Sequence, residues 1–396
     1  MKIVSLEARV IKLPFRFSFK HSLASRNFSE NLIVRAVLSD GSRNHVGYGE
    51  SIPRDYVTGE TVQAALARLE REFAPRFLQR QIDDPKSLLQ IMQNEFADLK
   101  LISVPAGSAW CALELALLDA FGHATSQPLS AFFGGVKRCH PARGIRYGGV
   151  IPFGGKKAVT ALLWFYKLFG FQTVKLKVGK TEDADLELVS IARRILGPDA
   201  ILRVDANCAW TADQTMQMAE KMKPFAVASI EQPVPADDIE GLIRISQSIE
   251  TPIMVDESLC TISQAKDLTA QKACKAFNVR ISKVGGFLSA QAIVDIARSN
   301  GLIVQMGAQV GESGILSAAG RAFSSVNETF DNCEGSNNLF LLKQDVTLEN
   351  LNVGLGGWGS VLKGNGLGVT VRSAHLPKFL MNVSEVDNRN LVGSNW

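Results

Sequence analysis

The chain has 396 residues, of which 46% are hydrophobic, 21% charged and 8% aromatic. This composition is typical of a globular protein with a large buried core, and it excludes a disordered, collagen-like or coiled-coil chain. The 43 Lys and Arg residues exceed the 39 Asp and Glu residues by four. Because these charges are scattered along the chain, we expect no nucleic-acid partner.

Hydropathy and cysteine spacing bear on membrane association, secretion and the state of the thiols. The longest apolar stretch near the middle, residues 161–169, contains Lys167 and is shorter than the roughly 20 residues of a membrane span. The N-terminus carries Lys2, Glu7 and Arg9 within a strand-like alternation, unlike a signal peptide. The six cysteines lack C-x-x-C spacing, so we expect free thiols, no membrane association and a cytoplasmic location.

The first third of the chain combines strand and helix patterns. Residues 2–13, 31–38 and 46–50 are rich in Val, Ile and Leu, and Asp40-Gly41 supplies a turn between the second and third runs. From Thr61 the apolar period changes to that of a helix, and a second helix is predicted over 109–121. The sequence therefore predicts an α+β region built on an antiparallel sheet.

Beyond about residue 140, short β-branched runs alternate with longer helical patterns. The runs cover residues 174–178, 201–204, 227–230, 253–255, 276–281 and 302–306. Such alternation predicts a parallel sheet. A doubly wound sheet would show a G-x-G-x-x-G turn after an early strand, and no early strand of this sequence is followed by such a turn. We therefore predict an α/β fold with a closed barrel.

Charged residues mark the ends of five successive runs. They are Lys177, Asp205, Glu231, Asp256 and Lys283, separated by 28, 26, 25 and 27 residues. The active sites of barrel enzymes lie at the carboxyl ends of the strands, so these side chains are expected to converge on one opening.

Three of these residues are acidic and form a candidate metal site. Asp205, Glu231 and Asp256 would supply only oxygen ligands, which suits Mg²⁺ first and Mn²⁺ second. Any one of them alone could instead cap a helix or pair with a basic neighbour. Three in register favour the metal site.

The lysines suggest acid–base chemistry. In K-L-K, strand alternation places Lys175 and Lys177 on the same inward face. Burial and like charge are expected to lower a lysine pKa toward the range of a base. Lys283 follows four strands after Lys177 and is expected to face it across the metal. This set suits removal of a proton α to a carboxylate, with the metal stabilising the enediolate.

These motifs together resemble the enolase superfamily, and within it the muconate lactonizing subgroup with its dipeptide epimerases and N-acylamino acid racemases. The resemblance covers nearly the whole chain. It rests on K-L-K, D-A-N, E-Q-P, D-E-S and S-K-V-G-G, together with G-Y-G-E at 47–50, A-L-E-L-A-L-L-D-A ending at Ala120, and G-L-G-V at 366–369.

The resemblance implies a (β/α)7β TIM-like barrel with an N-terminal α+β capping domain. The expected divisions are 1–135 for the cap, 136–365 for the barrel and 366–396 for a segment that returns to the cap. It also implies that Asp205, Glu231 and Asp256 bind Mg²⁺, that Lys177 and Lys283 are the two acid/bases, and that Lys175 assists. Asn207 shares the inward face with Asp205, and Glu257 is expected to support the metal ligands.

Other residues bear on the substrate. Related dipeptide epimerases carry D-x-D near the eighth strand, where this chain has F-D-N-C-E-G-S. This absence argues against a free amino terminus on the substrate, and it leaves Glu334 as a candidate polar group or a rim salt bridge. The loop S-I-P-R-D-Y-V-T-G-E-T is similar to the epimerases' cap loop, so Arg26, Arg54 and Tyr56 are candidates for contact with the substrate tail.

We therefore predict an Mg²⁺-dependent racemase or epimerase that acts α to a carboxylate of a small-molecule substrate, an amino-acid derivative or dipeptide, and that forms a homo-oligomer. The alternative is a cycloisomerase or syn-dehydratase, of the muconate lactonizing or o-succinylbenzoate synthase type, that uses the same enediolate. A third hypothesis is a non-catalytic scaffold with the same barrel.

Overall fold

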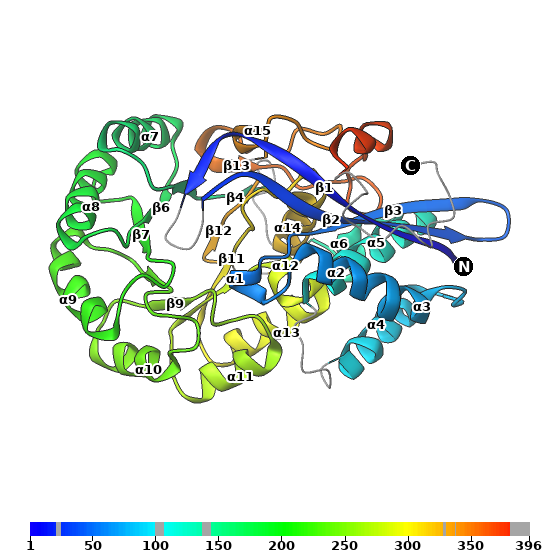
Figure 1. The fold of residues 1–396 in the computed structure, drawn as a ribbon, viewed down its shortest axis with the longest axis horizontal. Helices are drawn as coiled ribbons and strands as arrows, with labels where there is room; N and C mark the ends of the chain where they lie inside the picture. Colours follow the sequence, from blue (N-terminus) through cyan, green and yellow to red (C-terminus); the bar gives the residue numbers. More distant parts are fainter. Residues whose placement is uncertain (21–24, 100–106, 137–143, 328–329, 337, 381–396) are drawn as a thin grey trace.

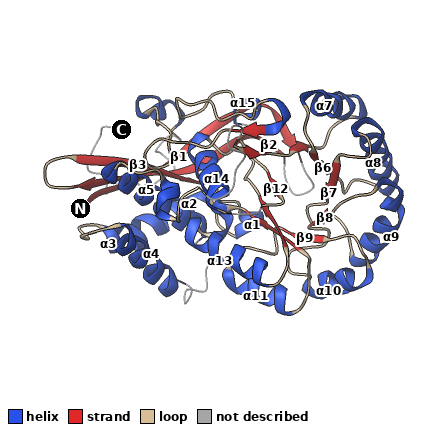
Figure 2. Ribbon diagram, turned by 180° about the vertical axis from the view of Figure 1, so that it is seen from behind, coloured by secondary structure: helices blue, strands red, loops and turns tan. Residues whose placement is uncertain are grey.

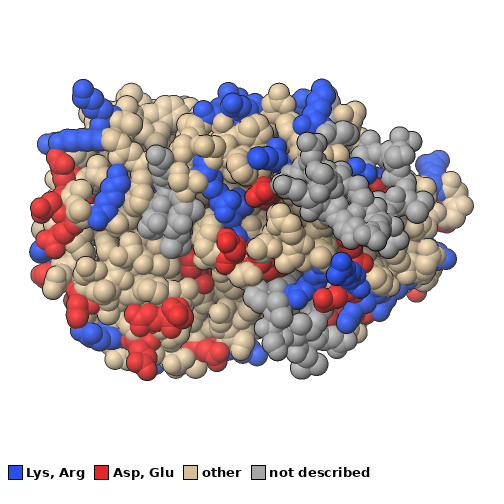
Figure 3. Space-filling view, viewed as in Figure 1, with Lys and Arg blue, Asp and Glu red and all other residues tan. Residues whose placement is uncertain are grey.

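In the computed structural model the chain forms a barrel with a smaller capping region at one side (Figures 1 and 2). The structure describes residues 1–396 except 21–24, 100–106, 137–143, 328–329, 337 and 381–396. None of the helices in these described ranges is long and apolar enough to cross a membrane. Lys, Arg, Asp and Glu side chains of both signs are spread over the face seen in Figure 3, without one basic stripe.

The capping region is built on a three-stranded antiparallel sheet of order β1-β2-β3. Its strands are β1 (Lys2–Lys20), β2 (Ser25–Ser39) and β3 (Asn44–Ser51). The helices α1 (Asp55–Thr58), α2 (Val62–Arg68), α3 (Ala74–Phe77), α4 (Pro85–Leu99) and α5 (Gly107–Thr125) follow. This arrangement confirms the α+β region predicted from the sequence.

Helix α5 lies against this sheet with very close backbones. A Cβ atom at Gly47 or Gly49 would lie 2.0 Å from the α5 backbone, at the nitrogen of Ala120 or the oxygen of Ala112. Only glycine allows this approach. The G-Y-G segment is therefore a packing requirement of the capping region.

The barrel is an eight-stranded, fully parallel sheet of order β12-β11-β10-β9-β8-β7-β6-β5. Its strands are β5 (Gly149–Ile151), β6 (Thr173–Lys177), β7 (Ile201–Asp205), β8 (Ile230–Glu231), β9 (Ile253–Val255), β10 (Ala276–Val279), β11 (Ile303–Met306) and β12 (Asn332–Cys333). The amide of Gly148 donates to the carbonyl oxygen of Cys333 at 2.8 Å, which links the two ends of the sheet. The predicted TIM-like barrel is confirmed.

Helices cover the outside of the barrel (Figure 2). They are α7 (Lys156–Phe169), α8 (Glu182–Leu196), α9 (Ala212–Met222), α10 (Ile239–Ser248), α11 (Ile262–Ala270), α13 (Gly286–Ser299) and α14 (Gly314–Val326). Several begin with a side-chain cap. Thr211 and Thr261, for example, both form a capping box with the glutamine three residues later.

Buried polar contacts fix the cap on the barrel. The Glu50 carboxylate of β3 accepts hydrogen bonds from the Ser313 hydroxyl at 2.6 Å and from the Leu316 amide at 2.9 Å, both at the start of α14. The carboxylate of Glu114 in α5 likewise accepts from the backbone amides of Phe287 and Leu288 at the start of α13. A carboxylate at a helix N-terminus satisfies amides that have no partner within the helix.

The predicted returning segment and the cysteines are only partly within the described residues. The amide of Leu129 donates to the backbone oxygen of Gly366 at 2.7 Å. The predicted returning segment, 366–396, otherwise lies partly outside the described residues. Cys111, Cys208, Cys260, Cys274 and Cys333 are free thiols as expected, whereas Cys139 lies outside the described residues.

Candidate active site

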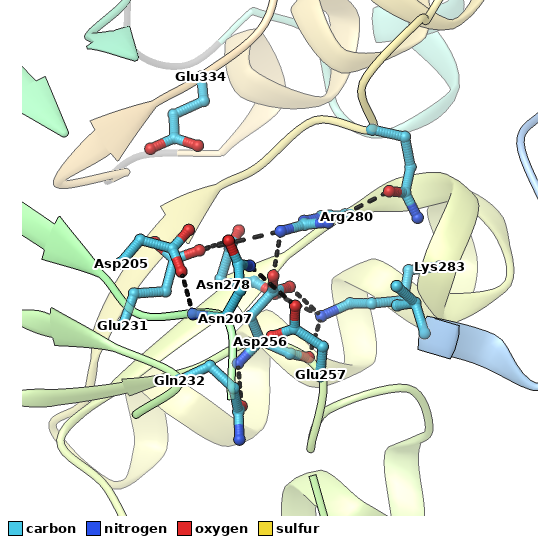
Figure 4. A network of polar contacts seen from close by, with 12 residues as sticks. Asp205, Asn207, Glu231, Gln232, Asp256, Glu257, Asn278, Arg280, Lys283 and Glu334 are labelled. Atoms are coloured by element: carbon cyan, nitrogen blue, oxygen red, sulfur yellow. Dashed lines mark hydrogen bonds and ion pairs between the residues drawn. The ribbon is translucent and has the colours of Figure 1, made fainter. Parts of the chain in front are cut away.

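Three acidic side chains gather at the carboxyl ends of neighbouring barrel strands (Figure 4). Asp205 and Glu231 end β7 and β8 and pair in register, and Asp256 directly follows β9. Each of the three is at most 1% exposed. The alternation of the strands thus brings the acids together as the sequence predicted.

The two lysines of K-L-K extend from β6 into this cluster. The Nζ atom of Lys175 lies 3.0 Å from both carboxylate oxygens of Glu231, 2.8 Å from Oε2 of Glu334 and 3.3 Å from Oδ2 of Asp205. The Nζ atom of Lys177 lies 2.7 Å from Oδ2 of Asp205. It also donates to the side-chain oxygen of Asn207.

The electrostatics of Lys175 differ from the expectation. Burial by itself lowers the pKa of this ammonium, but the carboxylates of Glu231, Glu334 and Asp205 outweigh burial and raise the pKa above its ordinary value. The prediction that neighbouring charges lower its pKa was therefore wrong for Lys175, because acids rather than the second lysine dominate its surroundings. Lys175 remains charged and can anchor an anion.

Arg203 and Glu334 form a further buried pair that the sequence analysis did not identify as a pair. Their side chains are 2.6 Å apart, although 131 positions separate them in the chain. Burial raises the pKa of Glu334, but Lys175 and Arg203 outweigh this and hold it below its ordinary value. Glu334 is thus a buried ion-pair partner and no rim group. Arg203 faces inward with Asp205 by strand alternation, a signal available in R-V-D.

Lys283 occupies a different position from the one predicted. Strand β10 ends at Val279, and Lys283 lies in the short helix α12 (Ile281–Val284), which ends at Gly285 with a φ of 93°. Its side chain is fully buried. Its Nζ atom donates to Oδ1 of Asp256 at 2.8 Å, to the backbone oxygen of Asn278 at 3.1 Å and to the backbone oxygen of Asp256.

Arg280 takes the place at the end of β10 that was expected for Lys283. It shares the inward parity of Asn278, whose amide donates to Oε1 of Glu231 at 2.8 Å. The Arg280 guanidinium contacts Asp256, lies 3.8 Å from Glu231 and donates to the side-chain oxygen of Gln309 at 3.1 Å. The period-two alternation from Asn278 to Arg280 is the signal that the sequence analysis overlooked.

The pKa values of the acidic side chains shift in different directions. Burial raises the pKa of Glu231 to about 7, with the nearby Asp205 carboxylate adding to the effect. Burial also raises the pKa of Glu257 to about 8, assisted by Asp256 and Asp205. For Asp256, burial is outweighed by Arg280 and Lys283, which hold its pKa below the ordinary value. The cluster therefore depends on its basic partners to remain ionised.

A cavity of about 320 Å³ opens beside the cluster. Among the described residues, its lining includes Lys175, Lys177, Asn207, Glu257 and Arg280, whereas Lys283 is not part of it. A substrate in this cavity can therefore contact both Lys177 and Arg280. The volume lies within the range of small-molecule sites.

The candidate substrate-tail residues are also near this cavity. Arg54 and Tyr56 line it, and Arg26 lies over the Tyr56 ring, with its guanidinium carbon 5.5 Å from the ring centroid. Arg54 is 3% exposed, and its guanidinium donates to the Ser29 hydroxyl at 2.9 Å and to backbone oxygens. Burial, helped by Arg26, lowers the pKa of Arg54 to about 10.

The donor set fits a hard divalent cation in its chemistry. Asp205, Glu231 and Asp256 supply carboxylate oxygens only, and Oε2 of Glu257 is a further buried oxygen that has no hydrogen-bond partner among the described residues. In the arrangement described here, no group of three such side chains in the described ranges is spaced around a single ion. The carboxylates instead bond to Lys175, Lys177, Arg280 and Lys283.

Comparison with known proteins shows the family of the chain. The family described as Enolase C-terminal domain-like matches residues 162–375, more than half of the chain. The chain belongs to this family. The match covers most of the barrel of this enolase-like chain, from α7 through β12.

Relatives of the enolase-like chain include enzymes of two reaction types. It is 28% identical over 333 residues to the L-Ala-D/L-Glu epimerase of Bacillus subtilis, which covers 83% of this chain and 87% of the relative. The crystal structure of a Cytophaga hutchinsonii dipeptide epimerase, complexed with Mg and D-Ala-L-Val, matches with a TM-score of 0.83 and 25% identity over 96% of this chain and 98% of that one. The 2-chloromuconate cycloisomerase of Rhodococcus opacus matches with a TM-score of 0.86 and 25% identity over 96% and 100%.

Proposed function

We propose that this chain is an isomerase that removes the proton α to the carboxylate of a small-molecule substrate, with Lys177 as the base. The observation that carries the proposal is the position of Lys177, whose ammonium lies in the cavity at the end of β6, next to the acidic cluster. Lys175 would remain charged beside it and hold anionic oxygen. Membership of the Enolase C-terminal domain-like family supports the same assignment.

Asp205, Glu231 and Asp256 would hold the metal ion, Mg²⁺ in the first place and Mn²⁺ in the second. When bound, such an ion would neutralise negative charge that develops on the substrate carboxylate. For this, Arg280 would have to leave its contact with Asp256. Asn207 and Glu257, joined by a 3.0 Å hydrogen bond, would orient the groups around Lys177.

The first candidate reaction is racemisation or epimerisation, since the relatives include an L-Ala-D/L-Glu epimerase and an N-succinyl-L-Arg/Lys racemase. The neutral amine of Lys177 would take the proton from one face of the α-carbon, giving the enediolate and the Lys177 ammonium, and a second group would return a proton to the other face. Lys283 is the predicted second group. Its burial and its three hydrogen bonds mean that it would have to move to reach the cavity.

The second candidate is a cycloisomerase or syn-dehydratase reaction, and the position of Arg280 favours it. Arginine keeps its proton at any physiological pH, and here the carboxylates around it raise its pKa further although burial acts the other way. If Lys177 is the acid/base on one face of the substrate and Arg280, a permanent cation, is the group on the other, the proton would leave and return on a single face. Arg280 would then stabilise negative charge without exchanging protons.

Exchange of the substrate α-proton with solvent deuterium tests the proposal. Pure enantiomers of N-acyl amino acids, dipeptides and other carboxylates would be incubated with the enzyme and Mg²⁺ in D₂O and followed by proton NMR. Exchange together with inversion supports the epimerase, and exchange or β-group chemistry without inversion supports the second candidate. No exchange in any compound class, with the metal present, would contradict the proposed function and favour a non-catalytic scaffold.

Three finer expectations belong to the same proposal. The divisions at 1–135, 136–365 and 366–396 are proposed as the cap, the barrel and the returning segment. Homo-oligomer formation and a cytoplasmic location remain predictions, to be checked by light scattering and by cell fractionation.

A further inference from the structure

One side of the cavity is formed by aromatic side chains from separate parts of the fold. We call them the aromatic wall: Phe17, Phe165, Tyr166, Phe169, Phe171 and Phe340. They come from the end of β1, from α7, from Phe171 two positions before β6, and from α15 (Asn338–Leu341). The C-terminal end of β1 lies near α7 and α15, which brings these segments together (Figure 1).

Five rings of the wall, all except Phe17, form a chain of ring contacts. The centroids of Phe165 and Phe169 are 5.2 Å apart in a stacked arrangement, and Phe165 meets Phe340 edge to face at 6.3 Å. Tyr166 and Phe171 approach to 4.7 Å. A connected set of rings of this kind forms a stable apolar surface with a defined shape.

The wall offers neither charge nor a free hydroxyl group to a ligand. Among the described residues, the cavity-lining side chains from β1, β5, α7 and α15 are all uncharged. The Tyr166 hydroxyl already donates to the backbone oxygen of Val150 at 3.0 Å. Lys156 and Lys167 of α7 lie outside the lining and bond to Glu187 and to the Ile195 carbonyl oxygen.

Parts of the wall remain in contact with water. Phe17 is 51% exposed, Phe340 46% and Phe165 39%. Covering apolar surface of this size with an apolar group is favourable in proportion to the area removed from water. The same cavity also contains Lys175, Lys177 and Arg280, so one ligand can present an anionic group to the basic side chains and an apolar group to the wall.

We infer that the substrate carries a bulky, uncharged apolar group, aromatic or branched aliphatic, at the end distant from its reacting carboxylate. This inference rests on the proposed function for the carboxylate end only. The rival is a second anionic group held by Arg54, the buried guanidinium that lines the same cavity.

Binding measurements on the unmodified protein separate these two substrate classes. Calorimetric titration with Mg²⁺ present would compare three probes: butyrate, 4-phenylbutyrate with an added apolar ring, and glutarate with a second carboxylate. Burial of a phenyl group predicts that 4-phenylbutyrate binds roughly tenfold to a hundredfold more tightly than butyrate. Equal binding of these two, or tighter binding of glutarate than of 4-phenylbutyrate, would overturn the inference.

A matched pair of variants locates the effect on the wall. Phe165→Asp places a carboxylate among the rings, whereas Leu168→Asp adds the same charge on the same helix at a side chain that is 78% exposed and outside the lining. We expect Phe165→Asp to abolish the advantage of 4-phenylbutyrate over butyrate, and Leu168→Asp to leave it unchanged. An unchanged advantage in folded Phe165→Asp would contradict the inference.

These outcomes are separate from those of the proposed function. The probes report equilibrium binding, whereas the enediolate chemistry is tested by deuterium exchange. A protein that prefers 4-phenylbutyrate but exchanges no α-proton would retain the wall as a binding site and lose the proposed reaction. A protein that exchanges α-protons of small carboxylates without preference for an apolar tail would retain the reaction and lose this inference.

Discussion

Lys177 and Lys283 are expected to fail in different ways when each is replaced by methionine, which keeps much of the side-chain volume and removes the charge. Lys177 lines the cavity, and Asp205 would keep Lys175 at 3.3 Å in its absence. Lys177→Met should therefore leave the protein folded and lower α-proton exchange by roughly 10² to 10⁴.

The loss of unfolding free energy expected for Lys283→Met follows from the contacts of the Lys283 side chain. Its fully buried ammonium bonds to the Asp256 carboxylate and to two backbone oxygens, so removal leaves buried acceptors without a donor and Asp256 with Arg280 as its remaining cation. Breaking a buried pair in this way costs about 3–5 kcal/mol of unfolding free energy. The Lys177→Met loss should be smaller, about 1–2 kcal/mol.

Urea unfolding measures the loss of stability, provided that the variants and the wild type show the same dependence of unfolding free energy on urea concentration. Proton NMR in D₂O measures the loss of α-proton exchange independently. The reasoning would be refuted if Lys283→Met retained wild-type stability but lost exchange for one substrate enantiomer only. That result would make Lys283 the base of the second face and would support 1,1-proton transfer. Full exchange in Lys177→Met would remove Lys177 as the base.

Three further predictions concern the metal, the substrate tail and pH. Asp256→Asn should weaken Mg²⁺ binding at least tenfold in a calorimetric titration while circular dichroism remains unchanged, because one of three ligand charges is lost; unchanged affinity would contradict the metal site. Arg54→Ala and Tyr56→Ala should change which substrates are used while the exchange rate of a minimal carboxylate stays the same, since both residues line the cavity from the cap; a uniform loss would indicate a role in folding or closure. Burial raises the pKa of Glu114 from 4.5 to about 7 in the folded protein, so the folded state binds more protons between these values and the free energy of unfolding should fall as pH rises through this window, by roughly 3 kcal/mol for this group. Glu114→Gln should reduce the slope of unfolding free energy against pH between pH 4.5 and 7 by the share of one proton, while Glu231 and Glu257, whose pKa values burial also raises, keep the remainder. An unchanged slope would show that Glu114 does not contribute to it.

The sequence by itself determined the architecture and most of the acidic site. Alternating runs and helices predicted the barrel, and the charged ends of those runs predicted Asp205, Glu231 and Asp256 as neighbours. This succeeded because parallel strands end at the same side of a barrel and because side chains alternate along each strand. The same alternation correctly placed Lys175 and Lys177 inside.

The tertiary structure decided that Arg280, and not Lys283, lines the cavity. The strand that begins at Ala276 was expected to continue to Ile281, but it ends at Val279 and α12 begins after Arg280. Lys283 is therefore buried and hydrogen-bonded to Asp256, and Arg280 takes the inward position. An error of two residues in the end of this strand changes which basic side chain lines the cavity. Apolar periodicity does not locate a strand end to within two residues.

Contacts between distant segments were likewise beyond the sequence pattern. Glu334 pairs with Arg203 across 131 positions, Glu50 meets Ser313 across 263, and the aromatic wall joins β1, α7 and α15. Local propensity and periodicity describe neighbours along the chain, whereas these pairs depend on how the closed barrel and its cap bring remote strands and helices together. The chemistry of the strand ends could be predicted from the sequence, but the partners of each charge and the shape of the cavity required the fold.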